Sequence, residues 1–173
     1  MIIGLIGNKR VGKDTFADYL VEKYNFRKIA FADPIKNGVQ ILFDLSDEQL
    51  NGNLKEVIDK RWNRTPRQIL QEIGTDYCRK NYGEDIWIKR MKYELSKSKD
   101  TNIVISDIRF PNEAEAVREM GGYLIKIIRN NIEISDKHIS EQLIETISFN
   151  NSIKNDGTFQ EYKNKIDKLI SSI

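Results

Sequence analysis

The feature that most constrains the fold is a glycine-bounded loop near the start of the chain. Gly7-Asn-Lys-Arg-Val-Gly12-Lys13 has the spacing G-x4-G-K. It follows an apolar segment, residues 1–6, that is typical of a buried strand, and it precedes a predicted amphipathic helix at about 13–24. A strand, a glycine-rich turn and a helix in this order present backbone N–H groups and the positive end of a helix dipole to an anion. The pattern predicts a phosphate-binding loop in an α/β chain.

The polar positions of this loop indicate a nucleoside triphosphate with its metal. Lys13 is expected to reach the outer phosphates. The next position usually holds Ser or Thr as a magnesium ligand, whereas this chain has Asp14 followed by Thr15. Because a carboxylate is also a good hard ligand, the metal shell changes without being lost. We therefore predict that ATP and Mg²⁺ bind here, with Asp14 on the metal, through Gly7, Val11, Gly12, Lys13, Asp14 and Thr15.

A second anchor is predicted where another apolar strand ends in an acid. Residues 103–105 are apolar, and Ser106 and Asp107 follow them. Asp107 is expected to hold the magnesium ion directly or through water, or else to cap a turn. Arg109 is close enough in the chain to reach a phosphate, with Glu113 orienting it, although the two residues could equally form a surface pair. Lys13, Asp107, Arg109 and Glu113 are the predicted catalytic residues.

The order of predicted elements favours a parallel sheet with helices on both faces. Strands are expected at about 1–6, 27–32, 102–106, 122–128 and 148–154, and helices at about 13–24, 33–42, 65–81, 85–97, 112–120 and 158–173. Residues 44–64 are expected to be irregular. We predict one domain over residues 1–173, with a helical excursion at about 33–98 and a lid-like segment at about 129–142.

Composition excludes several classes of function. The chain has 173 residues and a formal net charge of +2, which is too mild a balance for a nucleic-acid-binding face. One cysteine and one histidine exclude an intrachain disulfide, a thiolate cluster and a multi-histidine zinc site. No apolar run has membrane-spanning length, and the first seven residues are too short for a signal peptide. We expect a cytoplasmic protein that binds neither nucleic acid nor membrane, and homodimer formation is left open.

The predicted helix that begins at Thr65-Pro66 has an unusual polar side. At 100° per residue, one side of this helix is apolar and comprises Ile69, Leu70, Ile73 and Tyr77. The other side carries few charges, and Gly74 within it costs roughly 1 kcal/mol relative to alanine in a helix. A guanidinium, amides and a hydroxyl beside a glycine suit a phosphate and a base edge, unless the glycine is merely tolerated. That second side comprises Arg67, Gln71, Gly74, Thr75 and Cys78.

Several segments together resemble the phage-type deoxynucleoside monophosphate kinases. They cover nearly the whole chain and comprise Val11–Thr15, Phe31–Lys36, Thr65-Pro-Arg-Gln-x-x-Gln-x-x-Gly-Thr-Asp76, Trp87, Ser106-Asp-Ile-Arg-Phe-x-Asn-Glu113, His138-x-Ser140-Glu141 and Asn155-Asp-Gly-Thr158. The resemblance implies a P-loop fold like that of nucleoside monophosphate kinases, and ATP-dependent phosphorylation of a dNMP to a dNDP. It implies an acceptor site at Asp33, Lys36, Arg67, Gln68, Gln71, Gly74, Thr75 and Trp87. One departure is Val11, where a small polar residue is expected.

Other P-loop proteins remain as alternatives. A phosphate acceptor needs no strong general base, because its second pKa is near 6. A hydroxyl acceptor needs one, and Asp33 is the best-placed candidate, as a shikimate, gluconate or dephospho-coenzyme A kinase would require. A phosphomevalonate kinase also uses a phosphate acceptor. A non-enzymatic nucleotide switch is disfavoured, since Asn164-Lys-Ile-Asp167 matches the guanine-binding N-K-x-D motif only by accident, inside a predicted helix.

Some residues have two interpretations of equal weight. Trp87 either stacks on a base or packs in the core. Arg129 and Lys137 either cover the transferring phosphates or are ordinary surface charges, and His138 either anchors the lid-like segment or touches ligand. Asn155 and Gly157, before the last helix, either lie beside adenine or form a simple turn.

Overall fold

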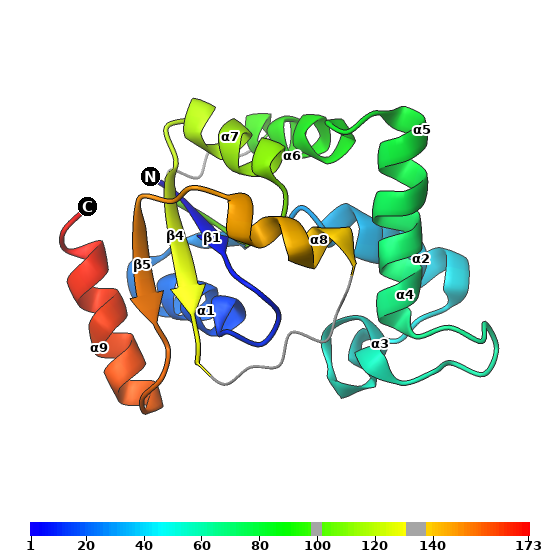
Figure 1. Cartoon of the computed structure of the whole chain (residues 1–173), viewed down its shortest axis with the longest axis horizontal. Helices are drawn as coiled ribbons and strands as arrows, with labels where there is room; N and C mark the ends of the chain where they lie inside the picture. Colours follow the sequence, from blue (N-terminus) through cyan, green and yellow to red (C-terminus); the bar gives the residue numbers. More distant parts are fainter. Residues whose placement is uncertain (98–101, 131–137) are drawn as a thin grey trace. The chain divides into compact units, whose positions relative to one another are not determined.

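The computed structural model describes residues 1–97, 102–130 and 138–173, and within it the chain forms two compact units (Figure 1). The first unit joins Met1–Ala30 to Lys97–Ile173, and the second is Phe31–Ser96. The second unit begins and ends close to the predicted helical excursion. The single-domain prediction itself stays a prediction.

The first unit is built on a five-stranded sheet in the order β2-β3-β1-β4-β5. Every neighbouring pair of strands is parallel. The strands are β1 (Ile2–Ile6), β2 (Arg27–Ile29), β3 (Ile103–Ile108), β4 (Tyr123–Ile128) and β5 (Asn151–Lys154). Parallel strands place their carboxyl ends at one edge, so the loops that follow β1, β3, β4 and β5 gather there.

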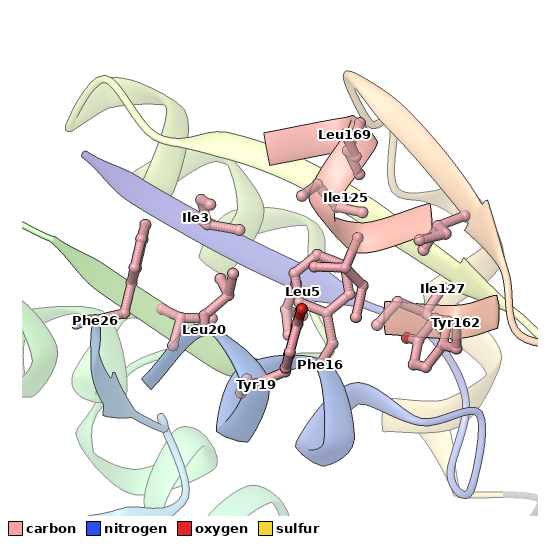
Figure 2. Close-up of a cluster of buried hydrophobic side chains, with 14 of the residues drawn as sticks. Ile3, Leu5, Phe16, Tyr19, Leu20, Phe26, Ile125, Ile127, Tyr162 and Leu169 are labelled. Atoms are coloured by element: carbon pink, nitrogen blue, oxygen red, sulfur yellow. The ribbon is translucent and has the colours of Figure 1, made fainter. Parts of the chain in front are cut away.

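Helices cover both faces of this sheet. On one face, α1 (Lys13–Tyr24) and α9 (Phe159–Ile170) bury Phe16, Leu20 and Tyr162 against Ile3 and other strand residues (Figure 2). On the other face lies α7 (Pro111–Glu119), which contacts η3 (Leu143–Thr146), and α8 (Ile139–Gln142) leads into η3. Side chains alternate between the faces of a strand, so Gly4 is opposite Ile3, where Ile108 and Leu124 come closest to it and Val117 of α7 lies beyond them.

One carboxylate joins the first helix to the last. Asp167 of α9 accepts hydrogen bonds from the hydroxyls of Tyr19 and Tyr24 at 2.9 and 2.8 Å, and it pairs with Lys23 at 2.7 Å. Asp167 is the final residue of the N-K-x-D match, and its place inside α9 agrees with the prediction that this match is accidental.

The second unit is helical, with a small core of its own. Val39, Leu45, Leu50 and Ile69 are buried together. Its elements are α2 (Asp33–Phe43), α3 (Asp47–Asn51), η1 (Asn53–Glu56), α4 (Pro66–Gln71), η2 (Glu72–Arg79), α5 (Lys80–Tyr82) and α6 (Ile86–Ser96). The irregular segment predicted at 44–64 is therefore wrong in part. Ser46 and Gln49 form a capping box that starts α3, and this reciprocal pair is a helix signal in the sequence.

The predicted helix at 65–81 changes its winding in the middle. Thr65 and Gln68 form a capping box that starts α4. From Glu72 to Arg79 the backbone is a π-helix, and α5 continues it, so Figure 1 shows one uninterrupted rod. A π-helix bonds residues five apart and turns more slowly than an α-helix. Side chains four apart therefore no longer lie in one row beyond Gln71, which corrects the predicted alignment of Thr75 with Arg67 and Gln71.

The predicted fold class is confirmed, with strand and helix limits shifted by a few residues. The parallel five-stranded sheet and its flanking helices lie where alternation of apolar segments placed them. Within the described part of the chain, no helix combines the length and apolarity needed to cross a membrane. Of the lid-like segment predicted at 129–142, residues 131–137, with Lys137, lie outside the described residues, while Ile139–Gln142 form the short helix α8.

Candidate active site

The glycines of the phosphate loop have conformations that other residues adopt only with strain. Gly7 has φ 149° and Gly12 has φ 105°, both in the region that favours glycine. A Cβ on Gly7 would also lie 2.6 Å from the carbonyl oxygen of Ile127 in β4. The loop can turn this tightly against its neighbouring strand only because both positions lack a side chain.

Lys13 is buried beneath this loop, with 6% of its surface exposed. Its Nζ donates hydrogen bonds of 2.7 Å to the carbonyl oxygens of Gly7 and Asn8. Burial, followed by the positive charge of Arg109, lowers the pKa of Lys13 to about 7. The ammonium charge is thus held at the centre of the loop at an energetic cost that a bound polyanion would relieve.

Four charged side chains, from α1, β3, α8 and the residue after β3, act on Lys13. Arg109 disfavours its charge, while Glu141, Asp14 and Asp107 favour it and raise its pKa. Asp107 is the fifth residue of β3, and Arg109 follows directly after that strand. The structure therefore brings the predicted residues Lys13, Asp14, Asp107 and Arg109 together at the carboxyl edge of the sheet.

Arg109 is fixed by two carboxylates rather than one. Glu113 accepts hydrogen bonds from the backbone N–H groups of Arg109 and Phe110, at 2.9 and 3.2 Å. The Arg109 guanidinium pairs with Glu141. Glu113 was predicted to orient the side chain of Arg109, and the structure shows that it holds the backbone where α7 begins. The partner of the guanidinium, Glu141, was not among the predicted site residues. Its only signal in the sequence was the His138-x-Ser140-Glu141 motif.

The loop after β5 lies against the phosphate loop. Asn155 donates from Nδ2 to the carbonyl oxygen of Val11 at 2.9 Å. The hydroxyl of Tyr162, in α9, donates to the carbonyl oxygen of Gly12 at 3.2 Å. Val11 itself is buried in the core, which suits an apolar side chain at this position. Asn155 therefore has a structural task in bracing the loop. Arg129 and Gly157 are exposed at the ends of their loops, and their roles in ATP binding stay predictions.

Both residues that were predicted to hold a metal ion, Asp14 and Asp107, are carboxylates. Asp14 is exposed and pairs with Lys28 of β2 at 2.9 Å, while Asp107 is half-buried. Among the described residues, no group of three or more histidine, cysteine or acidic side chains could hold a metal by itself. This fits Mg²⁺, which usually binds through one or two carboxylates together with the phosphates of its nucleotide.

In the second unit, several predicted acceptor residues have partners within the unit. Arg67 pairs with Glu56 at 2.6 Å, and Lys36 donates to Asn51 at 2.8 Å. Gln68 caps α4 through the backbone N–H of Thr65, at 2.8 Å, so capping accounts for this residue. Gln71 and Thr75 are half-buried and Asp33 is exposed.

Gly74 serves packing within the second unit. A Cβ at Gly74 would lie 2.8 Å from Cδ1 of Ile35 in α2. The carbonyl oxygen of Gly74 also accepts a 2.7 Å hydrogen bond from Nε1 of Trp87. Ile35 lies against Gly74, so packing accounts for this glycine, and its role beside an acceptor stays a prediction. Trp87, half-buried, joins α6 to the π-helix and its role towards a base stays a prediction.

A phosphate loop, a buried lysine, an arginine and two carboxylates on a parallel sheet define a P-loop kinase. Comparison with known proteins agrees. The sequence model of the family described as deoxynucleotide monophosphate kinase matches residues 1–63 and, in an overlapping match, 45–166. The chain belongs to the deoxynucleotide monophosphate kinase family.

Named relatives support this assignment. A protein of Acanthamoeba polyphaga mimivirus that bears the name deoxynucleotide monophosphate kinase is 39% identical, over 99% of this chain and 97% of its own length. The deoxynucleotide monophosphate kinase of Enterobacteria phage T4 is 23% identical over 98% of both chains. The predicted family resemblance and the predicted kinase class are confirmed.

Solved structures show the same fold at low sequence identity. A protein of Thermus thermophilus superposes with a TM-score of 0.53 at 12% identity, covering 99% of this chain and 96% of that one. Dephospho-CoA kinase from Campylobacter jejuni superposes with a TM-score of 0.51 at 18% identity, with the same two coverages.

Proposed function

We propose that the chain transfers the γ-phosphate of ATP to the phosphate of a deoxynucleoside monophosphate, giving ADP and a diphosphate for DNA synthesis. The observation that carries this proposal is the buried Lys13 in its glycine loop with Arg109 beside it, in a chain of this family. Phosphoryl transfer depends on positioning and charge neutralisation more than on covalent chemistry. Two cations at the phosphate loop can spread the charge of the transferring group.

Magnesium is proposed as the metal, held by Asp14 and Asp107. When bound, it neutralises charge on the β- and γ-phosphate oxygens. Lys28 would then lose part of its pairing with Asp14 and keep Asp18, to which it donates at 2.9 Å. We expect Asp14→Asn to raise the Mg²⁺ concentration needed for half-maximal activity, because it removes a charged ligand. Magnesium titrations that superimpose for the two proteins would exclude Asp14 as a ligand.

The second unit is proposed to bind the acceptor. Arg67 would take its phosphate by exchanging Glu56 for a second anion, and Gln71 would read the base edge with its amide. Asp33, Lys36, Thr75 and Trp87 complete the proposed surface. Because the acceptor is itself a phosphate, largely dianionic at neutral pH, no strong general base is required.

The direct test is ADP release measured with each common dNMP, each NMP, and the acceptors of the rival kinases. We expect turnover to rise with one or more dNMPs. Activity confined to dephospho-coenzyme A, phosphomevalonate or a hydroxyl acceptor would assign the chain to another reaction. Slow ATP hydrolysis that ignores every acceptor would indicate a nucleotide switch.

We further propose that the protein acts in the cytoplasm of a bacterial host or infected cell, where ATP and DNA precursors meet. Its mild net charge of +2 supports the absence of nucleic-acid binding. Homodimer formation stays open to sedimentation measurements.

A further inference from the structure

Two buried carboxylates converge on one arginine. Among the described residues, the acidic residues that are buried as a whole are Glu113 and Glu141, which are 3% and 4% exposed. Both contact Arg109, one through its backbone N–H and the other through its guanidinium. Burying a carboxylate costs free energy unless hydrogen bonds and opposite charge compensate it. Glu113 has a clear task in starting α7, whereas nothing derived so far uses Glu141.

Glu141 links the guanidinium of Arg109 to the phosphate loop. Its Oε1 accepts from Nη1 of Arg109, and its Oε2 accepts from the backbone N–H of Lys9 at 3.3 Å. These contacts join residues 32 and 132 positions apart in the chain. The carboxylate of Glu141 thus fixes the guanidinium of Arg109 relative to the phosphate loop.

The short helix α8 holds Glu141 in place. The Nδ1 atom of His138 accepts from the backbone N–H of Ser140 at 3.2 Å and caps the start of this helix. The backbone N–H of Glu141 donates to the carbonyl oxygen of His138 at 2.9 Å. The carboxylate is therefore presented by an ordered turn, and its charge offsets the repulsion between Arg109 and Lys13.

We propose that Glu141 is a positioning residue, which holds the guanidinium of Arg109 against the phosphate loop before the nucleotides bind. This rests on the proposed function, in which Arg109 contacts the transferring phosphate. A cation that is already oriented needs no reorganisation when charge develops in the transition state. The main effect of Glu141 on phosphoryl transfer is expected to pass through Arg109, since Gln at this position could still accept from the backbone N–H of Lys9.

The first test compares Glu141→Gln and Glu141→Asp with a matched control, Glu145→Gln. Glu145 lies four residues later, is exposed, and pairs with Lys126 at 2.7 Å. We expect Glu141→Gln to lower kcat by about tenfold to a hundredfold while KM for the dNMP stays within about twofold, because an oriented cation is lost from the transition state. Glu141→Asp should recover part of kcat, and Glu145→Gln should match the wild type. Wild-type kcat in Glu141→Gln would overturn the proposal.

A double-mutant cycle with Arg109→Ala separates positioning from simple stabilisation. If Glu141 acts through Arg109, Glu141→Gln should change kcat by less than about twofold once Arg109 is alanine. Losses that multiply would show that Glu141 acts independently and would overturn the proposal. Should Glu141→Gln fail to fold, Glu141→Asp takes its place in the cycle.

A measurement without turnover keeps this inference distinct from the proposed function. NMR of the labelled Arg109 guanidinium should show hindered rotation in the wild type and faster rotation in Glu141→Gln. A wild type that phosphorylates no dNMP would contradict the proposed function, and the NMR result would still decide whether Glu141 holds Arg109. Equal rotation in both proteins would overturn the inference alone.

Discussion

Among single residues, Lys13 combines burial with a proposed role in neutralising phosphate charge. Two loop carbonyl oxygens hold its Nζ, and burial lowers its pKa to about 7 from the usual 10.5. Between these two values the unfolded chain binds a proton that the folded protein does not. The stability of the nucleotide-free protein is therefore expected to rise with pH across that window, through Lys13.

Binding of ATP should return a proton to Lys13, because phosphate charge favours the ammonium form. At about pH 8.5 we expect uptake of about one proton per ATP, since the group is largely neutral there without nucleotide. Calorimetry in buffers of different ionisation enthalpy measures this uptake. Lys13→Met, which keeps the buried stem, should abolish both the uptake and phosphoryl transfer while the protein stays folded. Full activity in Lys13→Met would contradict the assignment of the phosphate loop.

Among the helices, α4 and the π-helix contain residues that are proposed to bind the acceptor. Arg67→Ala should lower kcat/KM for the dNMP by roughly tenfold to a hundredfold, since a charge-assisted hydrogen bond contributes about 1.5–3 kcal/mol. ATP binding should change little. Arg64→Ala is the matched control, because Arg64 is an exposed arginine paired with Glu72 at 3.0 Å. Equal losses toward ATP and dNMP would show that Arg67 serves some other purpose.

Gly74 offers a test of packing within the same unit. Gly74→Val is expected to lower the free energy of unfolding by about 1–3 kcal/mol, because added side-chain volume meets Ile35. Ile35→Ala should destabilise the wild type but restore part of the stability of Gly74→Val. Denaturant unfolding of the four proteins gives the coupling. If Gly74→Val instead left stability unchanged and abolished acceptor use, the result would support the prediction that the acceptor binds beside Gly74.

In the molecule as a whole, Asp167 joins the first and last helices of the chain, α1 and α9, within the first unit. Its bonds reach α1 from α9, across 148 positions for Tyr19. The ion pair with Lys23, with the two tyrosine hydroxyls, lowers the pKa of Asp167 below its usual 3.8. The stability that it provides is therefore present above about pH 4 and is lost as the pH falls through its folded-state pKa.

Asp167→Asn is expected to lower the free energy of unfolding at pH 7 by roughly 1–2 kcal/mol. The difference from the wild type should shrink below about pH 4, where the wild-type carboxyl also becomes neutral. Denaturant titrations at several pH values measure this. Asp156→Asn is a comparison with a single exposed ion pair, since Asp156 pairs with Lys165 of α9 and receives no tyrosine hydroxyl among the described residues. A difference that does not depend on pH would show that charge is not the cause.

The sheet, the phosphate loop and the family could all be predicted from the amino-acid pattern. Local rules suffice for these, because apolar strands alternating with helices allow few topologies and Gly7 and Gly12 can adopt backbone angles that other residues avoid. Lys13 ends the predicted loop, Asp107 follows the predicted strand and Arg109 comes two residues later, so the sequence could place all three near one edge of the sheet.

Which side chains meet could not be predicted and depends on the folded chain. Glu141 reaches Arg109 from a distant helix, and no local pattern encodes a pair of residues so far apart in the chain. The backbone changes from an α-helix to a π-helix at Glu72. A spacing of 100° per residue therefore predicts the wrong direction for the side chain of Thr75. A glycine within a helix predicts that another group approaches the backbone closely. Packing between the helices determines which group this is, and beside Gly74 it is Ile35.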